Sequence, residues 1–234
     1  MNTFYDSLQA IHARIDQAKA QVGRNDTVQL CAVSKAQSAE KIRSAYEAGQ
    51  TIFGENYVQE AITKQAQLQD CNIEWHFIGP IQSNKTQLIA QHFAWVHSVD
   101  RIKIAERLAN ARSSTMAPLN VCIQFNSSEE ASKSGAGMDE LTSLATAIKA
   151  LPTLNLRGIM AIPAPSKDIL QQRAQFKHVH KAYLALQQQG FALDTLSIGM
   201  SDDFEAAIAE GATIVRIGSA LFGARVYAQA YKTV

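Results

Sequence analysis

The chain has 234 residues, of which 47% are hydrophobic and 18% are charged, and its formal net charge is +1. This composition is ordinary for a globular protein, and the length suits one large α/β domain that needs no disulfide or metal for stability. The balance of 22 Lys and Arg against 21 Asp and Glu argues against a nucleic-acid-binding protein, which usually presents a basic face.

The cysteines and the amino-terminal segment indicate the cellular compartment. Three cysteines are scattered without CxxC spacing, and the amino-terminal segment lacks the continuous apolar stretch of a signal peptide. No segment approaches the length of a transmembrane helix. No HExxH motif or Cys/His cluster predicts a metal site. We therefore expect a soluble cytoplasmic protein without membrane, nucleic-acid or metal binding.

The first predicted element is an amphipathic helix within residues 1–23. Its apolar residues recur at helical spacings: Phe4, Leu8, Ile11, Ile15 and Val22. Gly23 ends this pattern. Because the helix precedes the first predicted strand, we expect it to plug or flank the bottom of the fold.

After this helix, short β-rich runs alternate with helical segments. The predicted strands are residues 28–34, 51–55, 73–78, 94–99, 120–125, 156–162, 195–200 and 213–218. Most are apolar throughout, which is typical of a parallel sheet covered by helices. Eight such units are the number in a closed barrel, and no GxGxxG motif follows the first strand to favour an open sheet. We predict an α/β fold, a single-domain (β/α)8 TIM barrel over residues 1–234.

The functional residues of such barrels lie in the loops that follow the strands. Lys35 directly follows the first predicted strand, and its side chain should point the same way as those of Cys31 and Val33. It is either a solvated lysine at a strand end or a partly desolvated amine that can form a Schiff base.

The last two predicted strands are each followed by glycine, serine and a helix. These turns are Gly199–Met200–Ser201 and Gly218–Ser219. Helix N-termini after the last two strands of a barrel commonly bind phosphate. Ordinary helix capping, with Asp202 and Glu205 as a capping box, is the alternative for the first turn.

Arg216 lies between apolar residues of the last predicted strand, so its guanidinium needs a partner. The partner is either a carboxylate, for example Glu55, or a ligand atom such as a ring nitrogen. An amine, a phosphate site and this arginine together suit pyridoxal 5′-phosphate, and they also suit a Schiff-base aldolase for a sugar phosphate. His76 and His97 are interpreted as core residues with hydrogen-bond partners.

Seven motifs extend over nearly the whole chain. They are AVSK (32–35), FGENYVQE (53–60), WHFIGPIQSNKTQLI (75–89), SKSG (132–135), GIMAIP (158–163), GMSDDFEAAI (199–208) and RIGSALFGAR (216–225). In this order they closely resemble the pyridoxal phosphate homeostasis protein family, the YggS-type proteins. The resemblance implies a fold-type III barrel like the N-terminal domain of alanine racemase.

The resemblance also implies a set of residues that bind pyridoxal 5′-phosphate. They are Lys35, Asn56, Met200, Ser201, Arg216, Gly218 and Ser219. Lys35 is implied to hold the cofactor as an internal aldimine, and Arg216 to face the pyridine nitrogen. Asn56 is implied to flank the ring, and Ser201 and Ser219 to hold the phosphate.

The family is thought to bind and buffer the cofactor without catalytic turnover. We expect the same function here, in a cytoplasmic monomer with pyridoxal-phosphate-dependent apo-enzymes as candidate partners. The alternatives are an amino-acid racemase or other fold-type III enzyme, and a scaffold that binds a protein through residues 126–136. The sequence differs from the family pattern at 36–38, where AQS replaces Thr-x-Pro and predicts a less rigid loop, and at 125–135.

Overall fold

The computed structural model describes residues 3–127 and 135–223. Within them, parallel strands close into a barrel in which each strand pairs with the next and the last pairs with the first. The strands are β1 (Gln29–Val33), β2 (Ile52–Glu55), β3 (Glu74–Phe77), β4 (Trp95–Val99), β5 (Leu119–Gln124), β6 (Leu154–Met160), β7 (Thr195–Ser197) and β8 (Ile214–Ile217). The predicted barrel is confirmed, although β7 ends at Ser197 and not at residue 200.

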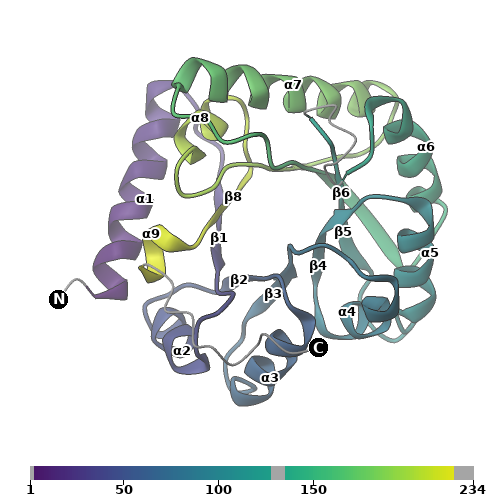
Figure 1. The fold of residues 1–234 in the computed structure, drawn as a ribbon, viewed down its shortest axis with the longest axis horizontal. Coiled ribbons are helices and arrows are strands. Elements are labelled where there is room, and N and C mark those ends of the chain that lie inside the picture. The colour runs from purple at the N-terminus through teal and green to yellow at the C-terminus, as the bar shows by residue number, and fades with distance from the viewer. Residues whose placement is uncertain (1–2, 128–134, 224–234) are drawn as a thin grey trace.

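Helices surround this ring of strands (Figure 1). They are α1 (Phe4–Gln21), α2 (Ala39–Glu47), α3 (Val58–Gln67), η1 (Ser83–Lys85), α4 (Thr86–His92), α5 (Ile102–Ala111), α6 (Met138–Lys149), α7 (Ile169–Gln188), α8 (Phe204–Ala209) and α9 (Ser219–Phe222). In the described part of the chain, none of them combines the length and hydropathy needed to span a bilayer. The expected single domain of residues 1–234 includes residues outside the described ranges, so its extent stays a prediction.

The amino-terminal helix α1 extends the outer ring of helices. It packs against α2, α8 and α9 (Figure 1). Its buried residues follow the predicted apolar stripe: Leu8, Ile11, Ile15 and Ala18. Of the two expected arrangements, plugging or flanking the bottom of the fold, the helix adopts neither strictly. It flanks the barrel, but at the side, along the ring of helices, and not beneath the strands.

The two faces of the sheet differ in polarity. Alternate residues of each strand point toward the helices and toward the barrel interior. Members of the main hydrophobic core include the strand residues Leu30, Ala32, Phe53 and Val96. Other strand positions carry buried polar side chains: His76, His97, Ser197 and Arg216. The His97 imidazole of β4 contacts the Ser197 hydroxyl of β7 at 2.8 Å, and these strands are not neighbours, so the centre of the barrel is polar.

The packing of α1 gives a stability prediction. Ile11 is 2% exposed, whereas Tyr5 on the same helix is 56% exposed. Replacing a buried isoleucine with alanine removes apolar contacts and leaves a cavity, so Ile11→Ala should lower the free energy of unfolding by about 2–5 kcal/mol in a denaturant titration. Tyr5→Ala should change it by less than about 0.5 kcal/mol. Equal effects of both variants would mean that α1 is not docked.

Candidate functional site

The predicted site residues gather at one end of the barrel. They follow, or lie near the carboxyl ends of, β7, β8, β1 and β2, which are consecutive neighbours around the ring: Lys35, Asn56, Met200, Ser201, Arg216, Gly218 and Ser219. The register pairs Ala32 with Ile217 on one side of β1 and Val33 with Gly54 on the other. The loop of Lys35 therefore lies between the loop of Asn56 and the loop of Gly218.

Lys35 is half-buried and follows the fully buried Ser34. The neighbouring loop comes very close to this strand end. The carbonyl oxygen of Val33 lies 3.2 Å from the position that a Cβ would take on Gly218. The first and the last βα loops thus meet at the mouth of the barrel, within reach of one small ligand.

The turn after β7 is shaped by Gly199 and Asp203. Gly199 has φ +93°, and a Cβ at this position would lie 2.7 Å from the Cβ of Ala207, so a larger residue does not fit. The N-cap residue of α8 is Asp203, and its carboxylate accepts the N–H of Met200 at 2.6 Å. The interpretation of Asp202 and Glu205 as a capping box is therefore wrong. Because the Met200 N–H is already bonded, Met200 could contact a ligand only through other atoms.

Two hydroxyls face each other at this end. The Ser219 hydroxyl at the start of α9 donates to the Ser201 hydroxyl at 3.1 Å. Neither serine is buried. Hydroxyls rotate freely, so both can turn to donate to the same anion. The described structure brings together the two serines that the sequence places in separate turns.

Arg216 is 4% exposed and is held by oxygen atoms. Its Nη1 donates to the carbonyl oxygen of Ser197 at 2.6 Å and to the hydroxyl of Ser197 at 2.7 Å, and its Nη2 donates to the carbonyl oxygen of Ala161 at 3.0 Å. Glu55, the carboxylate considered from the sequence, pairs instead with Lys64 at 2.7 Å. Among the described residues, these bonds use three of the five guanidinium N–H groups, and the others remain for a ligand.

A chain of hydrogen bonds continues from Arg216 through the barrel interior. The Ser197 hydroxyl contacts Nδ1 of His97 at 2.8 Å, and Nε2 of His97 contacts Nδ1 of His76 at 2.9 Å. Nε2 of His76 contacts the carboxylate of Glu74 at 2.8 Å. The prediction that His76 and His97 are core residues with hydrogen-bond partners is confirmed, but the chain itself was not predicted.

The groups at the two ends of this hydrogen-bond chain, Arg216 and Glu74, determine which atom donates in each of its hydrogen bonds. Burial lowers the pKa of both imidazoles, and His76 and Arg216 lower the pKa of His97 further. The hydrogen bond from His76 is the main cause of the lowered pKa of Glu74. An ionised Glu74 can only accept, so each neutral imidazole carries its proton on Nε2 and accepts at Nδ1. The Ser197 hydroxyl must then donate to His97 while it accepts from Arg216.

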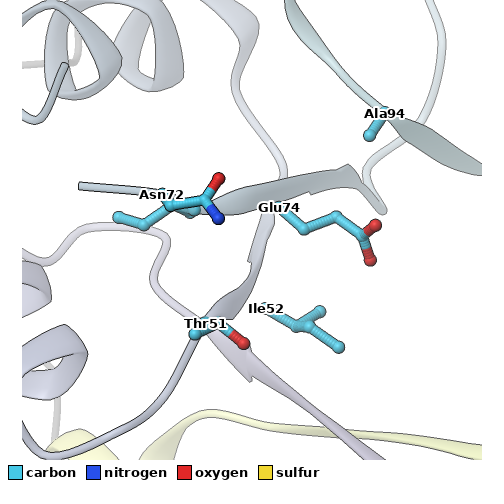
Figure 2. Close-up of a pocket in the computed structure, with 6 residues that line it drawn as sticks. Thr51, Ile52, Asn72, Glu74 and Ala94 are labelled. Atoms are coloured by element: carbon cyan, nitrogen blue, oxygen red, sulfur yellow. The ribbon is translucent and has the colours of Figure 1, made fainter. Parts of the chain in front are cut away.

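Glu74 lies at the opposite end of the barrel from Lys35. It lines an open depression of about 510 Å³ together with Thr51, Ile52, Asn72, Ile73 and Ala94 (Figure 2). These residues belong to, or precede, the amino-terminal ends of β2, β3 and β4. The hydrogen-bond chain thus connects solvent at one mouth of the barrel with Arg216 inside it.

Asn56 presents a buried oxygen without a partner among the described residues. Its Oδ1 has no hydrogen bond there. The backbone around it is fixed by Gly79, where a Cβ would lie 2.4 Å from the carbonyl oxygen of Asn56. Buried polar atoms are rarely left unsatisfied, so this oxygen is a candidate contact for a bound polar molecule.

Sequence reasoning missed a second polar group beside Lys35. Lys64 is 5% exposed, and its ammonium contacts Glu55 at 2.7 Å and Glu60 at 2.5 Å. The i,i+4 spacing of Glu60 and Lys64 on α3 was the signal that could have found the second contact. Residues 128–134 lie outside the described ranges, and they include most of the 126–136 loop assigned to a scaffold function and all of the SKSG motif except Gly135. Within the described residues, 3–127 and 135–223, no group of three or more His, Cys, Asp and Glu side chains could hold a metal ion.

Comparisons with known proteins identify the class. Residues 7–226 match the family described as "Alanine racemase, N-terminal domain". The fold agrees, because alanine racemase from Corynebacterium glutamicum superposes with a TM-score of 0.65, at 19% identity, over 93% of this chain and 61% of that one. The chain is therefore a fold-type III barrel of the alanine racemase class.

Closer relatives narrow this class. The "Pyridoxal phosphate homeostasis protein" of Pseudomonas aeruginosa is 55% identical over 97% of this chain and 98% of that protein. PipY of Synechococcus elongatus PCC7942, solved with PLP bound, has a TM-score of 0.80 and 38% identity over 90% of this chain and 99% of that one. The chain belongs to the pyridoxal phosphate homeostasis protein family.

The lowered pKa values of His76 and His97 predict a pH dependence of stability. Below the pKa of about 6.5 for an unfolded histidine, the unfolded chain binds protons that the folded imidazoles do not, so stability must fall as the pH drops from 7 toward 5. His97→Gln should reduce the slope of unfolding free energy against pH by up to about 1.4 kcal/mol per pH unit. Urea titrations at several pH values measure this slope.

A control separates titration from general destabilisation. Val96 lies on the same strand and is fully buried. Val96→Ala should lower the unfolding free energy at every pH and leave the slope as in the wild type, because valine does not titrate. A His97→Gln slope equal to that of Val96→Ala would contradict the buried neutral imidazole.

Proposed function

We propose that this chain binds pyridoxal 5′-phosphate through Lys35 and takes part in the homeostasis of this cofactor without catalytic turnover. The names of its relatives describe a homeostasis protein and not an enzyme, which agrees with this proposal. PipY, a relative of known structure, carries the same cofactor.

The observation that carries the proposal is the meeting of three kinds of group at one barrel mouth. The loop that carries Lys35 lies beside the loop that carries Ser219, whose hydroxyl bonds that of Ser201, and Arg216 on the adjacent strand has N–H groups that the bonds described above do not use. The bound cofactor would supply an aldehyde for a Schiff base and a phosphate as an anionic handle. An aldehyde needs an amine, a phosphate needs donors and a pyridine nitrogen needs a donor, so the groups at this mouth fit the molecule.

Each residue has a role under this proposal. Lys35 would hold the aldehyde carbon, and Ser201 and Ser219, with the backbone of Gly218, would donate to the phosphate. Arg216 would donate to the ring nitrogen, which fixes that nitrogen as an acceptor because a guanidinium has no lone pair to offer. The unpaired oxygen of Asn56 would satisfy a polar group of the ring edge, and Met200 would border the phosphate turn.

The racemase alternative is not favoured. Racemisation needs an acid-base group on each face of the reacting carbon. Lys35 could serve one face, but Tyr57, the tyrosine that follows β2, is 61% exposed, so packing does not fix its ring in place.

The finer features of the function belong to the same proposal. We infer that the protein acts in the cytoplasm as a monomer and passes the cofactor to apo-enzymes that depend on it. Ser219 is exposed and Lys35 and Ser201 are partly exposed, which supports the transfer of the cofactor to another protein. Light scattering of the purified protein, alone and mixed with one apo-enzyme, would measure its oligomeric state and any complex.

The attachment gives a direct prediction. After incubation with pyridoxal 5′-phosphate and reduction with borohydride, peptide mapping should find the label on the peptide that contains Lys35. Lys35→Ala should lose the visible absorption band of the bound cofactor and keep its thermal stability without cofactor, because the half-buried side chain lies at the mouth and not in the hydrophobic core. A label found mainly on Lys41 or Lys85 would refute the attachment.

The phosphate site gives a second prediction. A hydrogen bond to a charged group contributes roughly 1.5–3 kcal/mol, so Ser201→Ala or Ser219→Ala should weaken cofactor binding by about 10–150-fold. Pyridoxal without phosphate should bind the wild type and both variants equally weakly. Ser113→Ala, an exposed serine after α5, serves as the control and should bind the cofactor as the wild type does. Unchanged affinity in both site variants would place the phosphate elsewhere.

A further inference from the structure

The two peptide groups that flank Lys35 are both held by side chains of α3. The carbonyl oxygen of Ser34 accepts from the ammonium of Lys64 at 2.8 Å. The N–H of Ala36 donates to the carboxylate of Glu60 at 2.6 Å. The backbone immediately before and after Lys35 is therefore fixed by a helix that belongs to the next βα unit.

These side chains form a largely buried group, which we call the Glu55–Lys64–Glu60 cluster, in which Oε2 of Glu55 has no hydrogen-bond partner among the described residues. The three N–H donors of Lys64 are all used, by Ser34, Glu55 and Glu60. The Ser34 hydroxyl also donates to Glu55 at 2.6 Å. Burial raises the pKa of the Glu55 carboxyl even though Lys64 and Ser34 act against it. Such a cluster is a costly way to stabilise a fold, so a positional role accounts better for it.

The conformation of Ala36 shows what the cluster holds. Ala36 has φ +60°, and it is the residue other than glycine with a positive φ among those described. The left-handed region is unfavourable for alanine because of its Cβ. Two bonds maintain it, namely the N–H bond to Glu60 and the turn bond from the N–H of Gln37 to the carbonyl of Ser34 at 3.0 Å. Strain of this kind persists only where the surroundings impose it.

We propose that Glu60 and Lys64 are positioning residues that hold the loop of Lys35 in the conformation that presents its amine to the cofactor. This inference rests on the proposed attachment at Lys35 and deepens it. Without the acceptor on Glu60, Ala36 would leave the left-handed region for much of the time. The apparent affinity for the cofactor would then fall in proportion to the fraction of molecules whose loop remains competent.

The test compares three variants by titration with pyridoxal 5′-phosphate. Glu60→Ala removes the acceptor and should weaken apparent binding by about tenfold, which corresponds to a competent fraction of about one in ten. Glu60→Gln keeps an oxygen at the same place and should bind within about twofold of the wild type. The control is Glu210→Ala, which removes a comparable ion pair, with Arg173, and should leave binding unchanged.

A rescue experiment separates positioning from general stabilisation. Glycine adopts the left-handed region freely, so Ala36→Gly combined with Glu60→Ala should recover most of the lost affinity. Ala36→Val should weaken binding even with Glu60 present, because a β-branched residue is strongly disfavoured at this φ. Position 36 is exposed, so neither change removes core packing. If Glu60→Ala lowers only the melting temperature of the apo-protein, or if glycine gives no rescue, the inference is wrong.

Borohydride mapping of the wild type keeps this test apart from the test of attachment. A label on Lys35 together with wild-type affinity in Glu60→Ala and Ala36→Val would overturn the positioning role alone. A label elsewhere would overturn the attachment, and the positioning role with it.

Discussion

The pairing of the first strand with the last is the contact on which the rest of the molecule depends. Four residues of β1 align with four of β8, from Gln29 with Ile214 to Ala32 with Ile217. This pairing closes the ring, and it leaves no unpaired strand edge among the described residues. Because the strands are parallel, it also brings the loop after β1 beside the loop after β8. The loops that carry Lys35 and Ser219 become neighbours only because the barrel closes.

Closure also creates a polar interior that must be satisfied. A guanidinium inside a barrel is costly unless oxygen atoms surround it, and Arg216 obtains them from Ser197 and Ala161. Ser197 can accept from Arg216 because it has His97 as an acceptor for its own proton, and His97 has His76. This chain of hydrogen bonds ends on the carboxylate of Glu74, which reaches solvent. Barrel closure, the placement of Arg216 and the neutrality of the two imidazoles are therefore parts of one arrangement.

The sequence predicted the fold well because its signals are local. The strands are apolar runs buried on both faces, and their positions follow from composition and spacing alone. The residues at the mouth could also be anticipated, because they follow strands and carry recognisable motifs. The hydrogen-bond partners of Arg216 could not be anticipated. They lie on β7 and directly after β6, and which residues of these strands face Arg216 depends on the strand register. Likewise the left-handed Ala36 could not be foreseen, because it depends on a helix that lies twenty-four residues further on. The loop expected to be less rigid is in fact bonded on both sides of Lys35.

The contact between the two ends of the described chain has a practical consequence. The rings of Phe4 and Phe222 lie 5.0 Å apart, and α9, which ends at Phe222, begins with Ser219. The start of α1 and a proposed phosphate contact thus share one small block of structure. A purification tag or fusion partner placed before Phe4 would adjoin that block and could disturb it. Cofactor affinity should therefore be measured on proteins prepared both with and without such an extension.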